Sequence, residues 1–271
     1  MSFMKRLDQA RKAYAEKDMA ASAAAHAPAV ITQAVEQHGG TSHQYIGDMV
    51  YGGLDGIVTT FAIVSGVSGA NLGSGVILIL GLANLLADGL SMAAGAFLSL
   101  KSEREYYDRE RERETWEIEH FPEGEFVEMI EIYRAKGYSR EDAEALMESQ
   151  SKDHDLWVDA MMVHELGLLP DDRQPLRSAM ATFVSFLLAG AVPLLVYLLG
   201  LVAPIDPAVS FPVALVLSGL ALFGLGAAKV FVTERNWFRS GLEMLLRYLD
   251  TDAMTAHRRY GAVDRTLRRV G

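Results

Sequence analysis

Two long stretches without charged residues dominate the first half of the chain. Residues 56–87 contain no Asp, Glu, Lys, Arg or His, and after Asp88 the same pattern continues to Leu100. The small and polar residues 69–75 favour a turn inside this region. Because about 20 apolar residues are needed to cross a bilayer core of about 30 Å, the pattern predicts two membrane-spanning helices, near 49–70 and 75–100.

A second pair of uncharged runs covers residues 178–205 and 207–228, separated by a short segment that contains two prolines. These runs predict a third and a fourth span. Four such runs in a chain of 271 residues leave no amphipathic helices that could cover them in a soluble protein. The predicted fold class is therefore all-α, a polytopic membrane helical bundle with a helical cytoplasmic insert between spans two and three.

The positions of Lys and Arg predict the orientation of these spans. Five basic residues precede residue 45, eleven lie in 101–177 and nine lie from Lys229 onward, whereas the turn inside each pair of spans contains none. Since basic residues favour the cytoplasmic side, both termini and the insert are expected there. The predicted domains are an N-terminal cytoplasmic segment (1–44), spans one and two (45–100), an acidic cytoplasmic domain (101–177), spans three and four (178–232) and a charged C-terminal segment (233–271).

Composition excludes several classes of function. The absence of cysteine excludes disulfides, thiolate zinc sites and cysteine nucleophiles. A net charge of −10 argues against a nucleic-acid partner, because phosphate binding needs a basic surface. The negative charge is concentrated in residues 101–177, where 22 acidic residues stand against 11 basic ones. Chemistry that depends on carboxylates is therefore expected in this insert.

Glutamates in the insert are paired at helical spacing. Glu114 with Glu117, and Glu125 with Glu128, are i, i+3 pairs that place two carboxylates on one helix face. Oxygen-rich clusters of this kind bind divalent cations such as Fe²⁺, Mn²⁺ or Ca²⁺. The alternative is a solvated acidic face with local ion pairs, because arginines are interleaved with these glutamates. The arginines in question are Arg109, Arg111 and Arg113.

The pattern of the insert predicts an outward continuation of the second span to about residue 120, followed by helices near 123–136, 139–150 and 152–167. On the last of these, Met161 and Met162 precede Glu165 by about one turn. Thioethers are soft ligands for Fe²⁺ or Cu⁺, although methionine on a helix more often fills a core.

Ionisable residues inside the predicted spans are costly in lipid and therefore indicate function. Asp55 lies in span one, and in span two Asn84, Asp88 and Met92 form a stripe of oxygen and sulfur ligands at four-residue spacing. If Asp55 faces this stripe, the membrane contains a cation path. The alternative is that Asp55 lies near the cytoplasmic interface and anchors the helix. The Gly-x-x-x-Gly pattern at 52–56 is a small-residue contact motif that can mark a dimer seam.

These motifs together resemble the vacuolar iron transporter family over residues 45–240. The resemblance rests on the order of Asp55-Gly56, Ser91-Met92-Ala93-Ala94-Gly95, Lys101-Ser102-Glu103, the paired glutamates and Glu165-Leu166-Gly167-Leu168.

Membership would imply a homodimer in the lipid bilayer that exports Fe²⁺, with Mn²⁺ as an alternative cargo, in exchange for protons. It also implies roles for individual residues. The implied metal ligands in the cytoplasmic domain are Glu114, Glu117, Glu125, Glu128 and Glu165, with Met161 and Met162 beside them. Asp55 and Met92 would belong to the translocation path. A position that is usually glutamate in the family falls on Asn84, and Asp88 one turn later is a candidate replacement.

The C-terminus departs from the family pattern, which usually includes a fifth span. From Trp237 onward no stretch free of charge and histidine exceeds four residues, so this segment cannot cross a bilayer. Two functions therefore stay open, namely a proton-coupled exporter and a membrane-tethered module that binds or sequesters metal without transport. A di-iron oxidase, suggested by Glu117-x-x-His120, would need two such motifs, so we predict no enzyme. We expect a bacterial cytoplasmic membrane, or a vacuolar membrane in a eukaryote.

Overall fold

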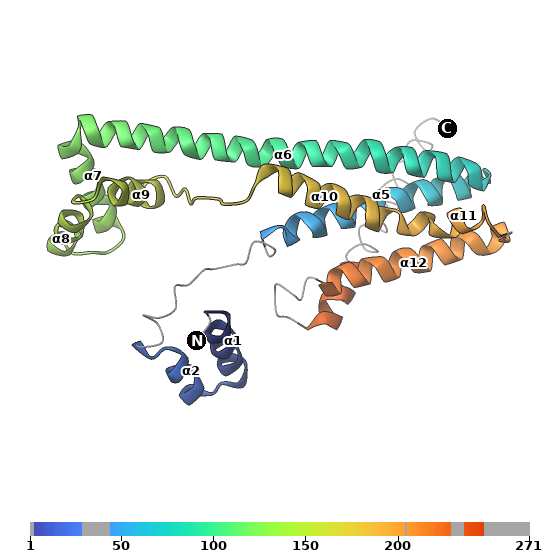
Figure 1. Ribbon diagram of the computed structural model, residues 1–271, viewed down its shortest axis with the longest axis horizontal. Helices are drawn as coiled ribbons and strands as arrows, with labels where there is room; N and C mark the ends of the chain where they lie inside the picture. Colours follow the sequence, from blue (N-terminus) through green and yellow to red (C-terminus); the bar gives the residue numbers. More distant parts are fainter. Residues whose placement is uncertain (1–2, 29–43, 204, 229–235, 247–271) are drawn as a thin grey trace, which may run out of the picture. The chain divides into compact units, whose positions relative to one another are not determined.

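The computed structural model describes residues 3–28, 44–203, 205–228 and 236–246, and every regular element within these ranges is helical (Figure 1). The chain divides into two compact units, Met1–Gln44 and Tyr45–Gly271. The first unit contains α1 (Phe3–Glu16) and α2 (Met19–Ala25). The side chain of Asp18 caps α2 by accepting hydrogen bonds from the first amides of that helix.

The second unit begins with a hairpin of two long helices, α5 (Ile46–Gly69) and α6 (Ser74–His120). The turn between them contains Asn71 in the left-handed region, with φ of 55°, a conformation that asparagine tolerates. α6 is one continuous helix of 47 residues, because it leaves the apolar region at Leu100 without interruption. Apolar helices long enough to cross a membrane occur four times among the described residues, which confirms the predicted all-α membrane fold.

The third span is less regular than the sequence pattern predicts. It consists of α10 (Pro175–Gly190), the 3₁₀ turn η1 (Val192–Leu194) and the short α11 (Leu195–Leu199). The predicted third span is present, but a 3₁₀ turn interrupts its helix and the span ends at Leu199. The physical reason is Pro193, which has no amide hydrogen to continue the hydrogen-bond ladder of α10. The fourth span, α12 (Pro207–Ala228), returns alongside α5 (Figure 1).

Glycines allow α5 and α10 to pack with their backbones in contact. A Cβ at Gly52 would overlap the carbonyl oxygen of Thr182, and a Cβ at Gly56 would overlap that of Phe186. This Gly-x-x-x-Gly pattern therefore serves a helix contact within one chain, and its interpretation as a dimer seam is wrong. The homodimer itself stays a prediction and would have to use a different face.

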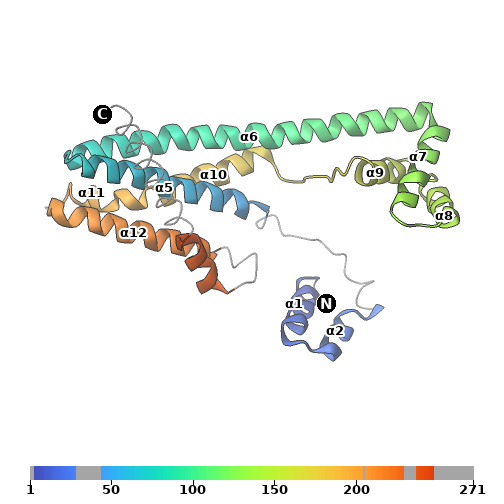
Figure 2. The same cartoon turned by 180° about the vertical axis from the view of Figure 1, so that it is seen from behind.

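The insert between the second and third spans folds into three helices at the far end of α6 (Figure 2). These are α7 (Pro122–Ala135), α8 (Arg140–Gln150) and α9 (His154–His164), close to the predicted ranges. Ser139 caps the start of α8, because its hydroxyl accepts a hydrogen bond from the amide of Asp142. Their shared apolar core includes Met129, Met147 and Trp157.

The C-terminal segment is described only at residues 236–246, where 237–246 are helical. Gly241 lies against the ring of Phe223, and Gly226 lies against the backbone of residues 240–241, so this helix packs closely on α12. The rest of 233–271, and with it the prediction that no fifth span follows, lies outside the described residues.

Candidate metal centre

Three glutamates from separate parts of the insert meet beside α6. Glu114 lies on α6, Glu125 lies in the first turn of α7, and Glu165 directly follows α9 as its C-cap residue. One carboxylate oxygen of each lies within 4.8 Å of those of the other two. Glu114 is completely buried and Glu125 is 9% exposed. Carboxylates that converge at this spacing are the ligand type that hard divalent cations prefer.

Burial and mutual repulsion make these negative charges costly when no cation is bound. Burial, reinforced by the charge of Glu165, raises the pKa of Glu114 to about 7. Burial also raises the pKa of Glu125, with Glu117 and Glu128 adding to the effect, and the pKa of Glu165, with Glu128 adding to it. Neither oxygen of Glu114 accepts a hydrogen bond, and the same holds for Oε2 of Glu165. A divalent cation would satisfy these buried oxygens and remove the repulsion.

The two other predicted glutamates lie at the edge of this group. Glu117 is partly buried one turn after Glu114, and its carboxylate lies 2.8 Å from a guanidinium nitrogen of Arg113. Glu128 is exposed on α7, and its charge acts on both Glu125 and Glu165. All five predicted glutamates thus form one electrostatically coupled group, here called the glutamate cluster.

Met161 and Met162 are fully buried in the core of the insert. The carbonyl oxygen of Met161 accepts a hydrogen bond of 2.9 Å from the amide of Glu165, so the last turn of α9 holds Glu165 in place. Their packing fits the core-filling alternative, and ligation of the metal by their sulfur atoms stays a prediction.

Arg111 connects the two helices that carry Glu114 and Glu165. Its guanidinium donates to the carboxylate of Asp159 on α9 and lies 3.7 Å from that of Asp155 one turn earlier. The sequence does not reveal this contact, because spacing suggests local partners for the arginines of α6 and gives no sign of a partner 48 residues away.

The predicted membrane residues lie along the contact between α5 and α6. Asp55 on α5 is close enough to Asp88 on α6 for their charges to interact. One turn further along α5, Thr59 accepts a hydrogen bond of 3.4 Å from the side-chain amide of Asn84. Met92 lines a cavity between α5, α6 and α10. The structure therefore places Asp55 opposite the predicted stripe.

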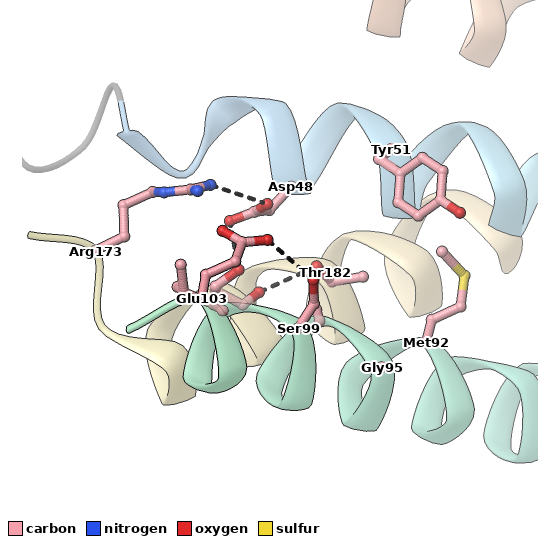
Figure 3. A pocket seen from close by; sticks show the side chains of 11 residues that line it. Asp48, Tyr51, Met92, Gly95, Ser99, Glu103, Arg173 and Thr182 are labelled. Carbon is pink, nitrogen blue, oxygen red and sulfur yellow. Dashed lines mark hydrogen bonds and ion pairs between the residues drawn. The ribbon is translucent and has the colours of Figure 1, made fainter. Parts of the chain in front are cut away.

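This cavity, of about 420 Å³, has charged residues on its wall that sequence analysis did not single out (Figure 3). They are Asp48 on α5, Glu103 on α6 and Arg173 in the segment before α10. Asp48 accepts a hydrogen bond of 2.7 Å from the hydroxyl of Ser178, and its carboxylate lies 3.9 Å from Arg173. In the sequence, each of these residues is only a charge near the edge of an apolar run. Such a charge usually marks the end of a span, so it does not indicate a cavity.

The sequence profile of the VIT family matches residues 46–255, which is most of the chain. The chain belongs to the VIT family. It is 40% identical over 252 residues to the vacuolar iron transporter of Toxoplasma gondii, covering 89% of this chain and 83% of that protein. The VIT family relative from Plasmodium falciparum, also a vacuolar iron transporter, is 34% identical over 252 residues, covering 89% and 91% of the two chains.

A VIT family relative from a plant, vacuolar iron transporter 1 of Arabidopsis thaliana, is 36% identical over 205 residues, covering 75% of this chain and 80% of that protein. The family predicted from the sequence is thereby confirmed. Membership, together with the apolar helices, identifies the chain as a multi-pass membrane protein that transports metal ions.

Proposed function

We propose that this VIT family protein exports Fe²⁺ from the cytoplasm in exchange for protons, with Mn²⁺ as an alternative cargo. The glutamate cluster captures the cation before it reaches the membrane path. The observation that carries this proposal is the burial of Glu114, which accepts no hydrogen bond and has one carboxylate oxygen within 4.8 Å of an oxygen of Glu125 and of one of Glu165. A purely solvated acidic face would leave these oxygens in water, so the alternative of a charged surface is less well supported.

Two further features support the proposed direction of metal transport and its coupling to protons. The distribution of Lys and Arg favours a cytoplasmic position for the insert, so the cluster would collect cations from that side. Asp55 and Asp88 provide two interacting carboxylates inside the spans, and such groups can hold either a proton or a cation. Asn84 supplies an amide oxygen, in place of a carboxylate, on the same stripe.

A second candidate is a membrane-tethered metal-binding module without transport. The charged C-terminal segment favours it, because the family usually carries a fifth span at this point. Both proposals assign metal binding to the glutamate cluster. They differ in whether metal ions cross the membrane along a path that includes Asp55. The relatives are named for the vacuole, whereas a bacterial cytoplasmic membrane stays a prediction for this chain.

Transport into liposomes tests both proposals. The purified protein is reconstituted in liposomes that contain an Fe²⁺-sensitive dye and an acidic lumen, and Fe²⁺ is added outside under anaerobic conditions. Wild type is compared with Asp55→Asn and with a variant in which four cluster residues become alanine. A matched control replaces Glu141 and Glu148, which are exposed on α8, with alanine. The four cluster residues are Glu114, Glu117, Glu125 and Glu128.

A carrier predicts proton-dependent quenching of the dye in wild type and the α8 control, and loss of flux in Asp55→Asn with unchanged Fe²⁺ binding. The cluster variant should lose both binding and flux at low Fe²⁺. Absence of flux in every protein, with binding that disappears only in the cluster variant, would establish the tethered module instead. Equal Fe²⁺ binding by the cluster variant and wild type would refute the role of the glutamates.

A further inference from the structure

Arg113 lies among the glutamates of α6 with each of its guanidinium nitrogens near a different carboxylate. Its Nε lies 3.1 Å from Glu110, one terminal nitrogen lies 2.6 Å from Glu114 and the other lies 2.8 Å from Glu117. Glu114 and Glu117 belong to the glutamate cluster, whereas Glu110 lies one turn earlier and outside it. The side chain of Arg113 therefore connects the proposed metal site to the carboxylate of Glu110, outside the glutamate cluster.

The charge of Arg113 also reaches the rest of the site. Among the described residues, it is the basic group that favours the ionised form of Glu114, Glu125 and Glu165 alike, and so opposes the rise in their pKa. Arg109, on the same helix, pairs with Glu110, which lies outside the glutamate cluster. The positive charge that a cation would bring to the cluster is thus partly supplied by the protein itself.

We propose that Arg113 is a built-in counter-ion that competes with the transported cation for Glu114 and Glu117 and shifts onto Glu110 when the cation binds. This inference rests on the proposed function of the glutamate cluster. According to this proposal, Arg113 weakens the affinity for the metal ion and thereby assists its release. It does not act by holding the metal ligands in place.

The local geometry permits such a shift. The side chain of Arg113 is 41% exposed, so its guanidinium can rotate toward solvent without disturbing the core of the insert. Glu110 already accepts a hydrogen bond from Nε, so Arg113 retains one charged partner after it leaves the cluster. The ion pair with Glu114 lacks hydrogen-bond geometry, because neither Glu114 oxygen accepts a hydrogen bond. A divalent cation, with twice the charge, can therefore displace the guanidinium from this oxygen.

Binding of Mn²⁺ to the full-length protein in detergent, measured by titration calorimetry at pH 8, tests the competition. Arg113→Gln removes the charge but keeps a polar side chain, and we expect it to bind Mn²⁺ about tenfold more tightly than wild type. Arg113→Lys keeps the charge and should bind within about threefold of wild type. Arg140→Gln is the matched control, because it removes an equal charge from the same domain while its partner, Glu144, lies on α8 and outside the cluster, and its affinity should stay within about twofold.

Glu110→Gln gives a second, independent measurement with the opposite sign. Without this partner, Arg113 should remain on Glu114 and Glu117, so Mn²⁺ should bind severalfold more weakly and a chelator should remove it faster. Weaker or unchanged binding in a folded Arg113→Gln protein would overturn the inference, since a residue that only shapes the site weakens binding when it is lost. Failure of the proposed function is distinguishable, because Glu114→Gln would then bind Mn²⁺ as well as wild type does.

Discussion

Replacement of Glu114 with glutamine should stabilise the metal-free protein at neutral and higher pH. Glutamine has nearly the same shape as the protonated carboxyl group, so the substitution removes the buried charge together with its ion pair to Arg113. The pKa of this carboxyl is about 7 in the folded protein, compared with 4.5 for an ordinary glutamate. The folded state therefore binds more protons than the unfolded state between these two values, and the wild type loses stability as the pH rises through this window.

The size of the effect follows from the two pKa values. Proton linkage destabilises the folded protein by about 1 kcal/mol at pH 5 and by about 3 kcal/mol at pH 8, both relative to the protonated side chain. At roughly 3 °C per kcal/mol, the melting temperature of Glu114→Gln should exceed that of wild type by ~9 °C at pH 8 and by ~3 °C at pH 5.

Thermal unfolding in detergent, followed by tryptophan fluorescence with a chelator present, measures this difference, because Trp157 lies in the core of the insert. Addition of Mn²⁺ should then raise the melting temperature of the wild type and leave that of Glu114→Gln unchanged. Equal melting temperatures at pH 8, or a less stable variant, would show that Glu114 carries no unfavourable charge and would refute the reasoning.

Three further outcomes follow from the structure. Because a proton and a cation compete for Glu114, Mn²⁺ affinity should fall by up to about tenfold per pH unit below pH 7, and a pH-independent titration would contradict this. Arg111→Ala should weaken Mn²⁺ binding about threefold by loosening α9, whereas Arg134→Ala, whose partner lies on its own helix, should not. Gly56→Ala should lower the melting temperature by about 5 °C because its Cβ meets the backbone of α10. Gly66→Ala, in the same helix but facing open space, is the control, and an equal loss there would refute the packing argument.

The spans could be predicted from sequence because lipid excludes charge so strongly that gaps in the charge pattern report the membrane directly. The same rule cannot locate a break in the helix inside an apolar run, so the charge pattern does not show that Pro193 interrupts the third span. Its effect depends on the backbone hydrogen bond that it removes, and hydropathy carries no information about that bond.

The glutamate pairs on α6 and α7 were likewise visible in the sequence, since helical spacing places each pair on one face. The convergence of the two pairs with Glu165 depends on tertiary packing. Arg111 and Asp159 hold α9 against α6, and neither residue signals a partner 48 positions away. Spacing likewise suggested local ion pairs for Arg113, which do exist, but two of its three partners are proposed metal ligands.

The unbroken length of α6 fixes how a captured ion can reach the membrane path. Glu114 and Asp88 lie on this one helix, 26 positions apart, so at 1.5 Å per residue their separation along its axis is about 40 Å. This is about five times the distance over which charges act through physiological salt, so direct electrostatic coupling between the two sites is negligible. Direct handover of the ion is impossible over such a gap. An ion that leaves the glutamate cluster must therefore travel most of this distance by diffusion before it reaches Asp88, so capture and membrane passage are separate steps.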